Sequence, residues 1–192
     1  MTVEALSLAI CVASGVFGRP AWTPDKCTER AGQLMEIGRR HGIDPLLMVA
    51  VNIQECDMRE DVNALVTVGE GKHKKVIGID ACPMGVRIIG PDWKKHRAPE
   101  ELYELAARRM EHWKSWCERG HHGRRPANLQ LEKHHFIAHY NQGNPVYASQ
   151  VLGFLATITH RKVREKDSSA YTERTREIVR RLTRVFSRWW VT

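Results

Sequence analysis

The sequence predicts an α+β fold that is mainly α-helical, with one small β-hairpin or sheet and a basic C-terminal helix. Apolar residues recur at helical spacing along most of the 192 residues, whereas only the region 64–79 has two short β-type runs joined by a polar turn. The length and the 42% hydrophobic content are those of one globular domain with extensions. We therefore expect an apolar N-terminal segment at 1–22, a main domain at 23–160 and a basic helical extension at 161–192.

The N-terminal segment is apolar from Leu6 to Phe17. Such a stretch can be a signal peptide, but no Lys or Arg precedes it, and Glu4 occupies a position where positive charge is expected. We therefore expect a helix that packs on the main domain, with a cleaved signal peptide as the alternative. Because the sequence has no run of ~18 apolar residues, it predicts no membrane span.

Two helices are predicted in the first third of the chain. Thr23-Pro24 is a cap and first-turn pair, and Gly42 marks the end of the helix that it opens. Asp44 and a proline start the next helix in the same way, and that helix ends near Glu55. Its apolar stripe is predicted to consist of Leu46, Val49, Ala50 and Ile53.

Glu55 is an unusual residue for the end of a helix. A helix C-terminus carries negative partial charge and prefers cations, so an acid there does not add stability. Burial behind the apolar turns and the helix dipole both disfavour the ionised form, so the pKa of Glu55 is predicted to be raised. A raised pKa is what a general acid requires near neutral pH. The alternative is a glutamate of the last turn that reaches solvent.

After Glu55 the sequence changes to β-type patterns. Residues 64–68 and 76–79 are short apolar runs, and residues 69–75 are polar and contain glycine, so a hairpin is predicted. Residues 80–91 are apolar but interrupted by Pro and Gly, which favours a loop with a short helical turn.

The second half of the sequence is again helical, and prolines or capping residues mark most of the helix starts. Helices are predicted from Pro99 to about Arg119, from Asn128 to Gly143, from Pro145 to before Arg161, and from about Ser169 to Trp190.

The last of these helices has two interpretations. Its apolar stripe can dock on the main domain, and this is the interpretation that we favour. Alternatively, its arginines and terminal tryptophans can contact a polyanion, a membrane or a partner. The stripe consists of Ile178, Val179, Leu182, Val185, Phe186 and Trp189, and the arginines are Arg174, Arg176, Arg180, Arg181, Arg184 and Arg188.

Most of the net charge lies in the C-terminal segment. Ten of the 30 Lys and Arg residues and four of the 22 Asp and Glu residues lie in 161–192, so this segment contributes +6 of the net +8. A basic segment favours anionic surfaces such as nucleic acid, anionic lipid or cell-wall polymer. Because the rest of the chain is nearly neutral, nucleic-acid binding is not expected.

Three separated segments carry a family resemblance. They are the helix that ends in Glu55, the segment Cys82–Ile88 (CPMGVRI), and the segment Ala138–Gly143 (AHYNQG). Their order and spacing resemble the lytic transglycosylase family of the lysozyme superfamily, close to its goose-type lysozyme branch. In that family a helix ends in Glu-Ser, a loop reads Gly-Ala-Met-Gly-Leu-Met-Gln, and a later segment reads Ala-Tyr-Asn-Ala-Gly. The resemblance spans Thr23 to Ile158 and implies that 23–160 is a lysozyme-like catalytic domain.

The resemblance implies a role for several residues of the three segments. Glu55 matches the catalytic acid, Met84 and Gly85 match the loop that approaches the sugar, and Tyr140 and Asn141 match residues that line the cleft. A glycine in that loop lets backbone and ligand come close.

The chain departs from the family pattern at three positions. Cys56 stands for the serine, Cys82 for the first glycine of the loop, and Ile88 for its glutamine. Ile88 therefore occupies a substrate-binding position without the amide that contacts sugar.

The implied reaction is cleavage of the β-1,4 bond between N-acetylmuramic acid and N-acetylglucosamine in peptidoglycan. One carboxylic acid protonates the bridging oxygen, the substrate's N-acetyl group supports the developing charge, and the same residue takes the proton of the C6 hydroxyl. The product has a 1,6-anhydro end, and neither a second carboxylate nor a cofactor is required.

Two alternatives to this reaction remain open. A hydrolytic muramidase would need a second carboxylate placed for water, and Asp80 is the best candidate, ahead of Asp57 and Asp61. A catalytically idle lysozyme-like module, serving as a structural or sugar-binding part of an assembly, is favoured by the changes at Cys56 and Ile88.

The cysteines and histidines suggest two further sites. None of the five cysteines forms a CxxC pair. The resemblance places Cys56 and Cys82 across the cleft from each other, so a disulfide that braces the site is a hypothesis. His135 and His139 lie four residues apart on a predicted helix with Glu132, a spacing that can hold zinc, but no HExxH motif occurs and no metal is expected.

The expected partner is the peptidoglycan glycan strand, and the expected place of action is the bacterial cell wall or periplasm. Because the N-terminus lacks a good export signal, delivery with a phage tail or virion is favoured over signal-peptide export. Proteins of such a phage tail or virion are then additional partners.

Overall fold

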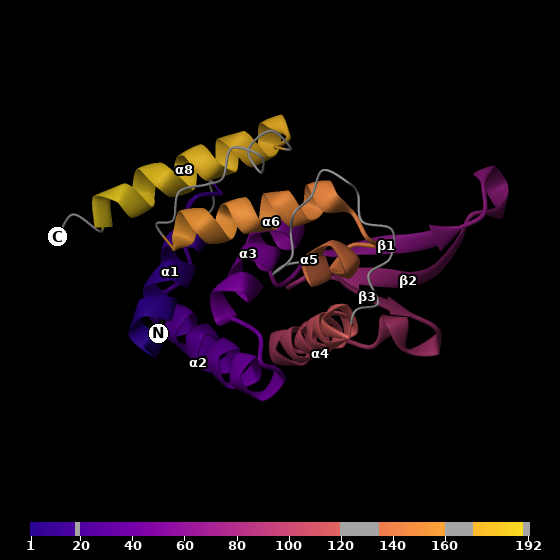
Figure 1. Ribbon diagram of the computed structural model, residues 1–192. Coiled ribbons are helices and arrows are strands. Elements are labelled where there is room, and N and C mark those ends of the chain that lie inside the picture. Colours follow the sequence, from indigo (N-terminus) through magenta and orange to yellow (C-terminus); the bar gives the residue numbers. More distant parts are fainter. Residues whose placement is uncertain (18–19, 120–134, 160–170, 190–192) are drawn as a thin grey trace.

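The computed structural model describes residues 1–17, 20–119, 135–159 and 171–189. It confirms the predicted α+β, mainly helical class, because most elements are helices and one small antiparallel sheet lies at one side of them (Figure 1). The helices are α1 Val3–Gly15, α2 Pro24–His41, α3 Pro45–Cys56, η1 Gly71–His73, η2 Pro91–Lys94, α4 Pro99–Glu118, α5 His135–Tyr140, α6 Pro145–Ile158 and α8 Glu173–Trp189. The strands are β1 Asn63–Val68, β2 Lys75–Ala81 and β3 Val86–Ile89.

Helix α3 is the central helix of the fold. Asp44 caps it by accepting a hydrogen bond from the Leu46 N–H at 2.9 Å, and Pro45 occupies its first turn. It contacts α1, α2 and α6. The predicted single apolar stripe is too narrow, because α3 is buried nearly all round, as expected for a helix without a polar face. Its buried residues are Leu47, Met48, Val49, Ala50, Val51, Asn52, Ile53 and Cys56.

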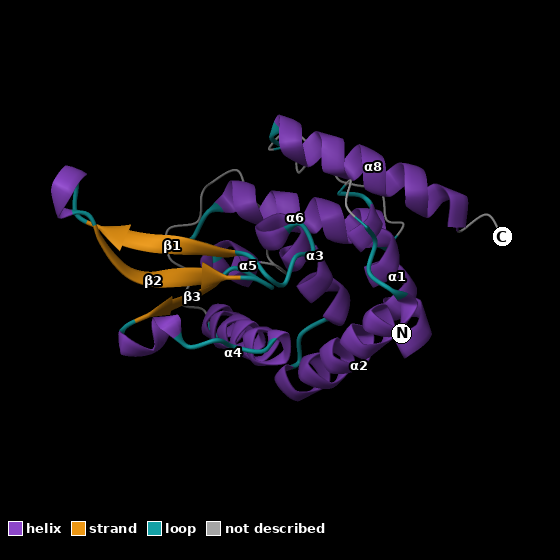
Figure 2. Ribbon diagram, turned by 180° about the vertical axis from the view of Figure 1, so that it is seen from behind, coloured by secondary structure: helices purple, strands orange, loops and turns teal. Residues whose placement is uncertain are grey.

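The sheet has the order β1-β2-β3 with antiparallel pairing throughout. The predicted hairpin is present as β1 and β2, and it projects away from the helices with η1 at its tip (Figures 1 and 2). The prediction of a loop for 80–91 is wrong over β3, whose residues pair with β2 from Gly78↔Ile89 to Ala81↔Val86. Pro83 and Gly85 are confined to the turn, so the four residues of β3 are free to pair with β2.

Helix α1 is the predicted N-terminal helix and packs on α2. Leu6 and Ile10 are fully buried, and a disulfide between Cys11 and Cys27 joins the two helices. No pattern in the sequence indicated this pairing. Within the described part of the chain, none of the helices combines the length and the apolar character that crossing a membrane requires.

Helix α8 lies along α6 (Figure 1) and also contacts α1. The predicted docking of its apolar stripe is confirmed, because Ile178, Leu182 and Phe186 are buried. The helix begins at Glu173, later than predicted, because the Thr172 hydroxyl accepts a hydrogen bond from the Thr175 N–H at 3.2 Å.

Several arginines of α8 are held by carboxylates, which reduces the charge available to a polyanion. Arg174 pairs with Asp57 at 2.5 Å, and Arg180 and Arg181 both pair with Glu177. The side chains of Arg188 and Trp189, together with Trp190, Ser169 and the predicted start of α5 at Asn128, lie outside the described residues.

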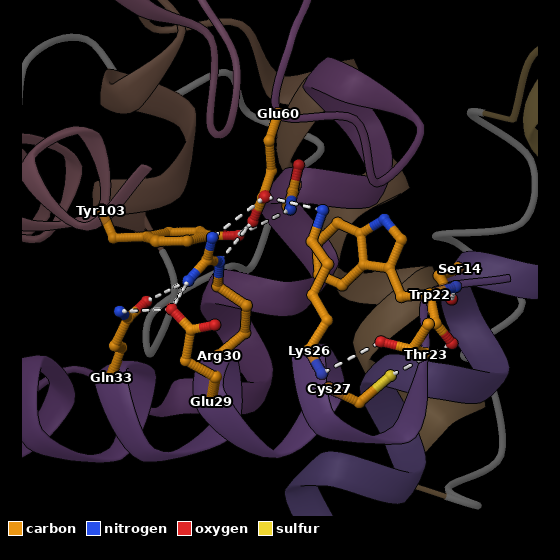
Figure 3. A network of polar contacts seen from close by, with 11 residues as sticks. Ser14, Trp22, Thr23, Lys26, Cys27, Glu29, Arg30, Gln33, Glu60 and Tyr103 are labelled. Carbon is orange, nitrogen blue, oxygen red and sulfur yellow. Dashed lines mark hydrogen bonds and ion pairs between the residues drawn. The ribbon is translucent and has the colours of Figure 1, made fainter. Parts of the chain in front are cut away.

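A buried polar network fixes the segment between α3 and β1 to the helices (Figure 3). Glu60 accepts hydrogen bonds from Arg30 at 2.6 and 3.2 Å, and it pairs with Lys26 at 2.9 Å. The Tyr103 hydroxyl, which accepts from Asn52 at 3.2 Å, lies 3.4 Å from the same carboxylate. The side chains of Arg30 and Glu60 are 11% and 9% exposed. Residues from α2, α3 and α4 thus converge on Glu60.

Candidate active site

The three segments of the resemblance meet around one small pocket. It has a volume of about 110 Å³ and lies where the end of α3, the sheet and the end of α5 come together. Its lining residues are Glu55, Asp80, Gly85, Arg87, Arg109, Tyr140, Asn141 and Gln142. Of the predicted site residues, the lining therefore includes Glu55, Asp80, Gly85, Tyr140 and Asn141. Met84 is fully buried and half-buried Ile88 packs against the core, and neither residue lines the pocket.

Glu55 is half-buried and has a raised pKa, as predicted. Burial is the largest cause, because it disfavours the charged form. The polar groups of Tyr147 and Asn141 oppose the rise, the charge of Asp80 adds to it, and the charge of Arg109 opposes it. Glu55 thus remains protonated at a higher pH than an exposed glutamate, which is the state in which it can donate a proton.

Tyr147 is a residue of the site that sequence reasoning missed. It lies in the first turn of α6, it is 3% exposed, and its ring stacks on Tyr140 with 6.5 Å between the centroids. Its buried hydroxyl has no hydrogen-bond partner of good geometry in the described structure, yet it is close enough to lower the pKa of Glu55. The hydroxyl is thus a donor available to the Glu55 carboxylate or to a ligand beside it. The sequence signal was weak, because a tyrosine on a helix is usually a core residue.

The loop between β2 and β3 brings backbone close to Glu55. Met84 and Gly85 both have positive φ angles, of 75° and 59°. The Tyr140 hydroxyl donates a hydrogen bond of 2.8 Å to the Met84 carbonyl, which ties the loop to the end of α5. A Cβ added at Gly85 would lie 2.6 Å from Glu55 Oε2 and 2.9 Å from Cδ. Only glycine therefore fits at this position with Glu55 in its present place.

A disulfide joins Cys56 to Cys82, the pairing proposed from the resemblance. Cys56 follows Glu55 directly, and Cys82 opens the loop that contains Gly85. The bond thus holds the end of α3 against the loop. Cys117 is buried and takes part in neither disulfide.

Asp80, the best candidate for a second carboxylate, lies in the pocket but is held by Arg87. The two residues are cross-strand partners of β2 and β3, and the guanidinium donates to both carboxylate oxygens at 2.8 and 2.9 Å. Asp57 and Asp61 do not line the pocket. Sequence reasoning missed Arg87 because the contact depends on the pairing of β3, which was not predicted.

His139 lies outside the pocket among aromatic side chains. Its ring stacks on Trp113 with 5.1 Å between centroids and meets Trp116 edge-on at 5.0 Å. Glu132 and the side chain of His135 lie outside the described residues. Within the described part of the chain, no group of three or more His, Cys, Asp or Glu residues is placed to hold a metal ion.

We expect Gly85→Ala to lower any activity of Glu55 by about 100-fold. The added Cβ must displace the carboxylate, and a shift of about 1 Å in a reacting group costs roughly that factor. The rate of cleavage by the purified variant measures the effect.

Gly71→Ala is the matched control, because Gly71 also has positive φ, of 53°, but nothing lies within 4 Å of its added Cβ. Both variants should lose about 1–2 kcal/mol of stability from the backbone conformation. Gly71→Ala should retain the full rate. Equal rates in both variants would show that the close approach of Gly85 to Glu55 has no functional role.

Two larger pockets flank α1, with volumes of about 600 and 410 Å³. Both are lined mainly by apolar residues and share Leu8 and Val12. Neither gathers the acidic, basic and amide groups that surround Glu55, so the 110 Å³ pocket is the better candidate for chemistry.

The fold and the pocket define a mainly helical α+β protein with a half-buried carboxylic acid at the end of its central helix. No protein-family model matches the sequence, and neither a curated protein nor a solved structure matches it.

Proposed function

We propose that this protein cleaves peptidoglycan glycan strands as a lytic transglycosylase, with Glu55 as the acid and then the base. The observation that carries the proposal is the position of Glu55. A carboxylic acid with a raised pKa lies in a small pocket whose lining includes residues from both of the other segments that carry the resemblance, together with Asp80 and Arg109.

The neighbours of Glu55 suit both halves of the reaction. In the first half Glu55 protonates the oxygen between N-acetylmuramic acid and N-acetylglucosamine, so it has to start neutral. After donation the Tyr147 hydroxyl and the Asn141 amide can stabilise the carboxylate, and Glu55 then accepts the proton of the C6 hydroxyl. No water is consumed, and the product carries a 1,6-anhydro end.

The environment of Asp80 favours the lyase over a hydrolase. A hydrolase needs a second carboxylate that is free to activate or position a water. Both oxygens of Asp80 already accept hydrogen bonds from Arg87. The same residue still lines the pocket, so hydrolysis assisted by Asp80 is the second candidate.

The two disulfides suit action at the cell wall or in the periplasm. Disulfides form and persist in oxidising compartments and are rare in the cytosol. We propose that the protein reaches the wall by export or as part of a phage tail or virion.

Product analysis tests the proposal. Purified peptidoglycan is incubated with the wild type and with Glu55→Gln, and the muropeptides are identified by mass spectrometry. We expect anhydro products from the wild type alone. Reducing ends would instead identify a hydrolase, and the absence of products from both proteins would leave an idle sugar-binding module.

A further inference from the structure

Arg109 differs in its surroundings from Arg87, the other arginine that lines the pocket. It lies on α4, it is half-buried, and it lines the pocket beside Glu55. Its guanidinium carbon is 5.1 Å from the centroid of the Tyr140 ring. In the described part of the chain it forms no ion pair, whereas its neighbour Arg108 pairs with Glu104 at 3.0 Å.

The charge balance of the pocket depends on this residue. Asp80 and Arg87 neutralise each other in a two-pronged ion pair. When Glu55 is protonated, as it must be to act as an acid, the guanidinium of Arg109 carries the charge that no other lining residue offsets. A partly buried cation next to an aromatic face, with hydrogen-bond donors to spare, suits a planar anion.

The size of the pocket limits what the anion can be. Its 110 Å³ is well below the roughly 300–1,000 Å³ of sites that enclose a whole ligand. A sugar ring would have to lie across the mouth, and only a substituent would enter. A carboxylate is planar, small and able to accept two hydrogen bonds from a guanidinium.

We propose that Arg109 forms a carboxylate-binding subsite beside Glu55, so that the protein prefers glycans whose repeating unit bears a free carboxylate over neutral acetamido-glycans. The identification of this glycan as peptidoglycan rests on the proposed function. In peptidoglycan the carboxylate can be that of the lactyl group, where the peptide has been removed, or one carried by the stem peptide.

A binding experiment tests this subsite without relying on cleavage. The protein is Glu55→Gln, which cannot transfer the proton. The ligands are a peptide-free tetrasaccharide of alternating N-acetylglucosamine and N-acetylmuramic acid, its lactyl methylamide, the peptide-bearing form, and the tetrasaccharide of N-acetylglucosamine. Affinities are measured by calorimetry at low and moderate salt.

We expect a carboxylate-bearing ligand to bind about 10- to 100-fold tighter than the neutral ligands, because hydrogen bonds to charged groups are the strong ones. If the lactyl acid binds tighter than its methylamide, the carboxylate that Arg109 binds is that of the sugar. If only the peptide-bearing form binds tighter, the carboxylate belongs to the stem peptide. Adding Arg109→Gln should remove the preference. Arg108→Gln, the matched control, should keep it because Arg108 does not line the pocket.

Equal affinities for acid and neutral ligands, a preference that survives Arg109→Gln, or no measurable binding would overturn the subsite. The proposed function fails by a different result, which is the absence of anhydro products from the wild type. A carboxylate preference without cleavage would support the subsite and contradict the lyase.

Discussion

Replacing Glu55 by Gln is expected to lower the rate of peptidoglycan cleavage by at least about 1,000-fold. General acid–base catalysis contributes roughly 100- to 10,000-fold, and here one residue serves as both acid and base. Glutamine has nearly the same shape but cannot donate a proton to the glycosidic oxygen. Initial rates of release of soluble muropeptides measure the effect.

Asp61→Asn is the control for this substitution, because Asp61 is an exposed acid close in sequence that does not line the pocket. It should cleave at the rate of the wild type. Asp80→Asn separates the lyase from the hydrolase, since only a hydrolase that uses Asp80 as a base should lose as much activity as Glu55→Gln. Full activity in Glu55→Gln would remove Glu55 from the mechanism.

The raised pKa of Glu55 also predicts how activity and stability depend on pH. Cleavage should decline as pH rises through the pKa of Glu55 in the folded state, which lies above the ordinary glutamate value of 4.5. At pH values between the pKa of Glu55 in the unfolded state and its pKa in the folded state, the native state binds more protons than the unfolded state, so the free energy of unfolding falls as pH rises. At a pH below the pKa of Glu55 in the unfolded state, this loss of stability is absent. Glu55→Gln should therefore gain stability over the wild type at neutral pH and not at low pH, as urea unfolding at the two pH values would show.

Removing the Glu60 carboxylate is expected to cost about 3–5 kcal/mol of stability, the range found when one partner of a buried ion pair is deleted. In Glu60→Ala the guanidinium of Arg30 stays buried and loses its two hydrogen bonds to Glu60. Urea unfolding with both disulfides intact measures the loss. The rate of cleavage should fall only in proportion to the fraction of protein that is unfolded, because Glu60 does not line the pocket.

Two controls distinguish the cost of the buried Arg30 charge from the cost of removing side-chain atoms. Arg30→Leu combined with Glu60→Leu removes both charges and should be more stable than Glu60→Ala, in which the buried guanidinium keeps only Glu29, whose side chain is 58% exposed, as an ion-pair partner. Glu36→Ala breaks an ion pair with Arg39 whose side chains are 54% and 73% exposed, and it should cost less than about 1 kcal/mol. If Glu60→Ala cost no more than Glu36→Ala, the network would not hold the segment after α3.

The sequence predicted the helices well where local chemistry decides their ends. Thr23-Pro24 and Asp44-Pro45 are cap and first-turn pairs, and α2 and α3 begin at those prolines. The raised pKa of Glu55 also followed from one helix, because an apolar run that ends in an acid predicts both burial and an unfavourable dipole.

Contacts between distant segments were much harder to predict. Strand β3 contains three β-branched residues, but it is only four residues long and directly follows a turn with Pro83 and Gly85, so the sequence favoured a loop and only the pairing with β2 defines the strand. The Asp80–Arg87 ion pair follows from that register. Arg109 looked like one more charged residue of an amphipathic helix, and only the packing of α4 against α5 brings it to the pocket.

The sequence by itself determined the mainly helical class, the central apolar helix and the acid at its end, because helix caps and apolar periodicity act over a few residues. Only the tertiary structure decided which groups surround that acid. The approach of Gly85 to Glu55 and the positions of the Tyr147 hydroxyl and the Arg109 guanidinium all depend on contacts between segments far apart in the chain. No local pattern records such contacts, because their energies arise only when the packed interior excludes water.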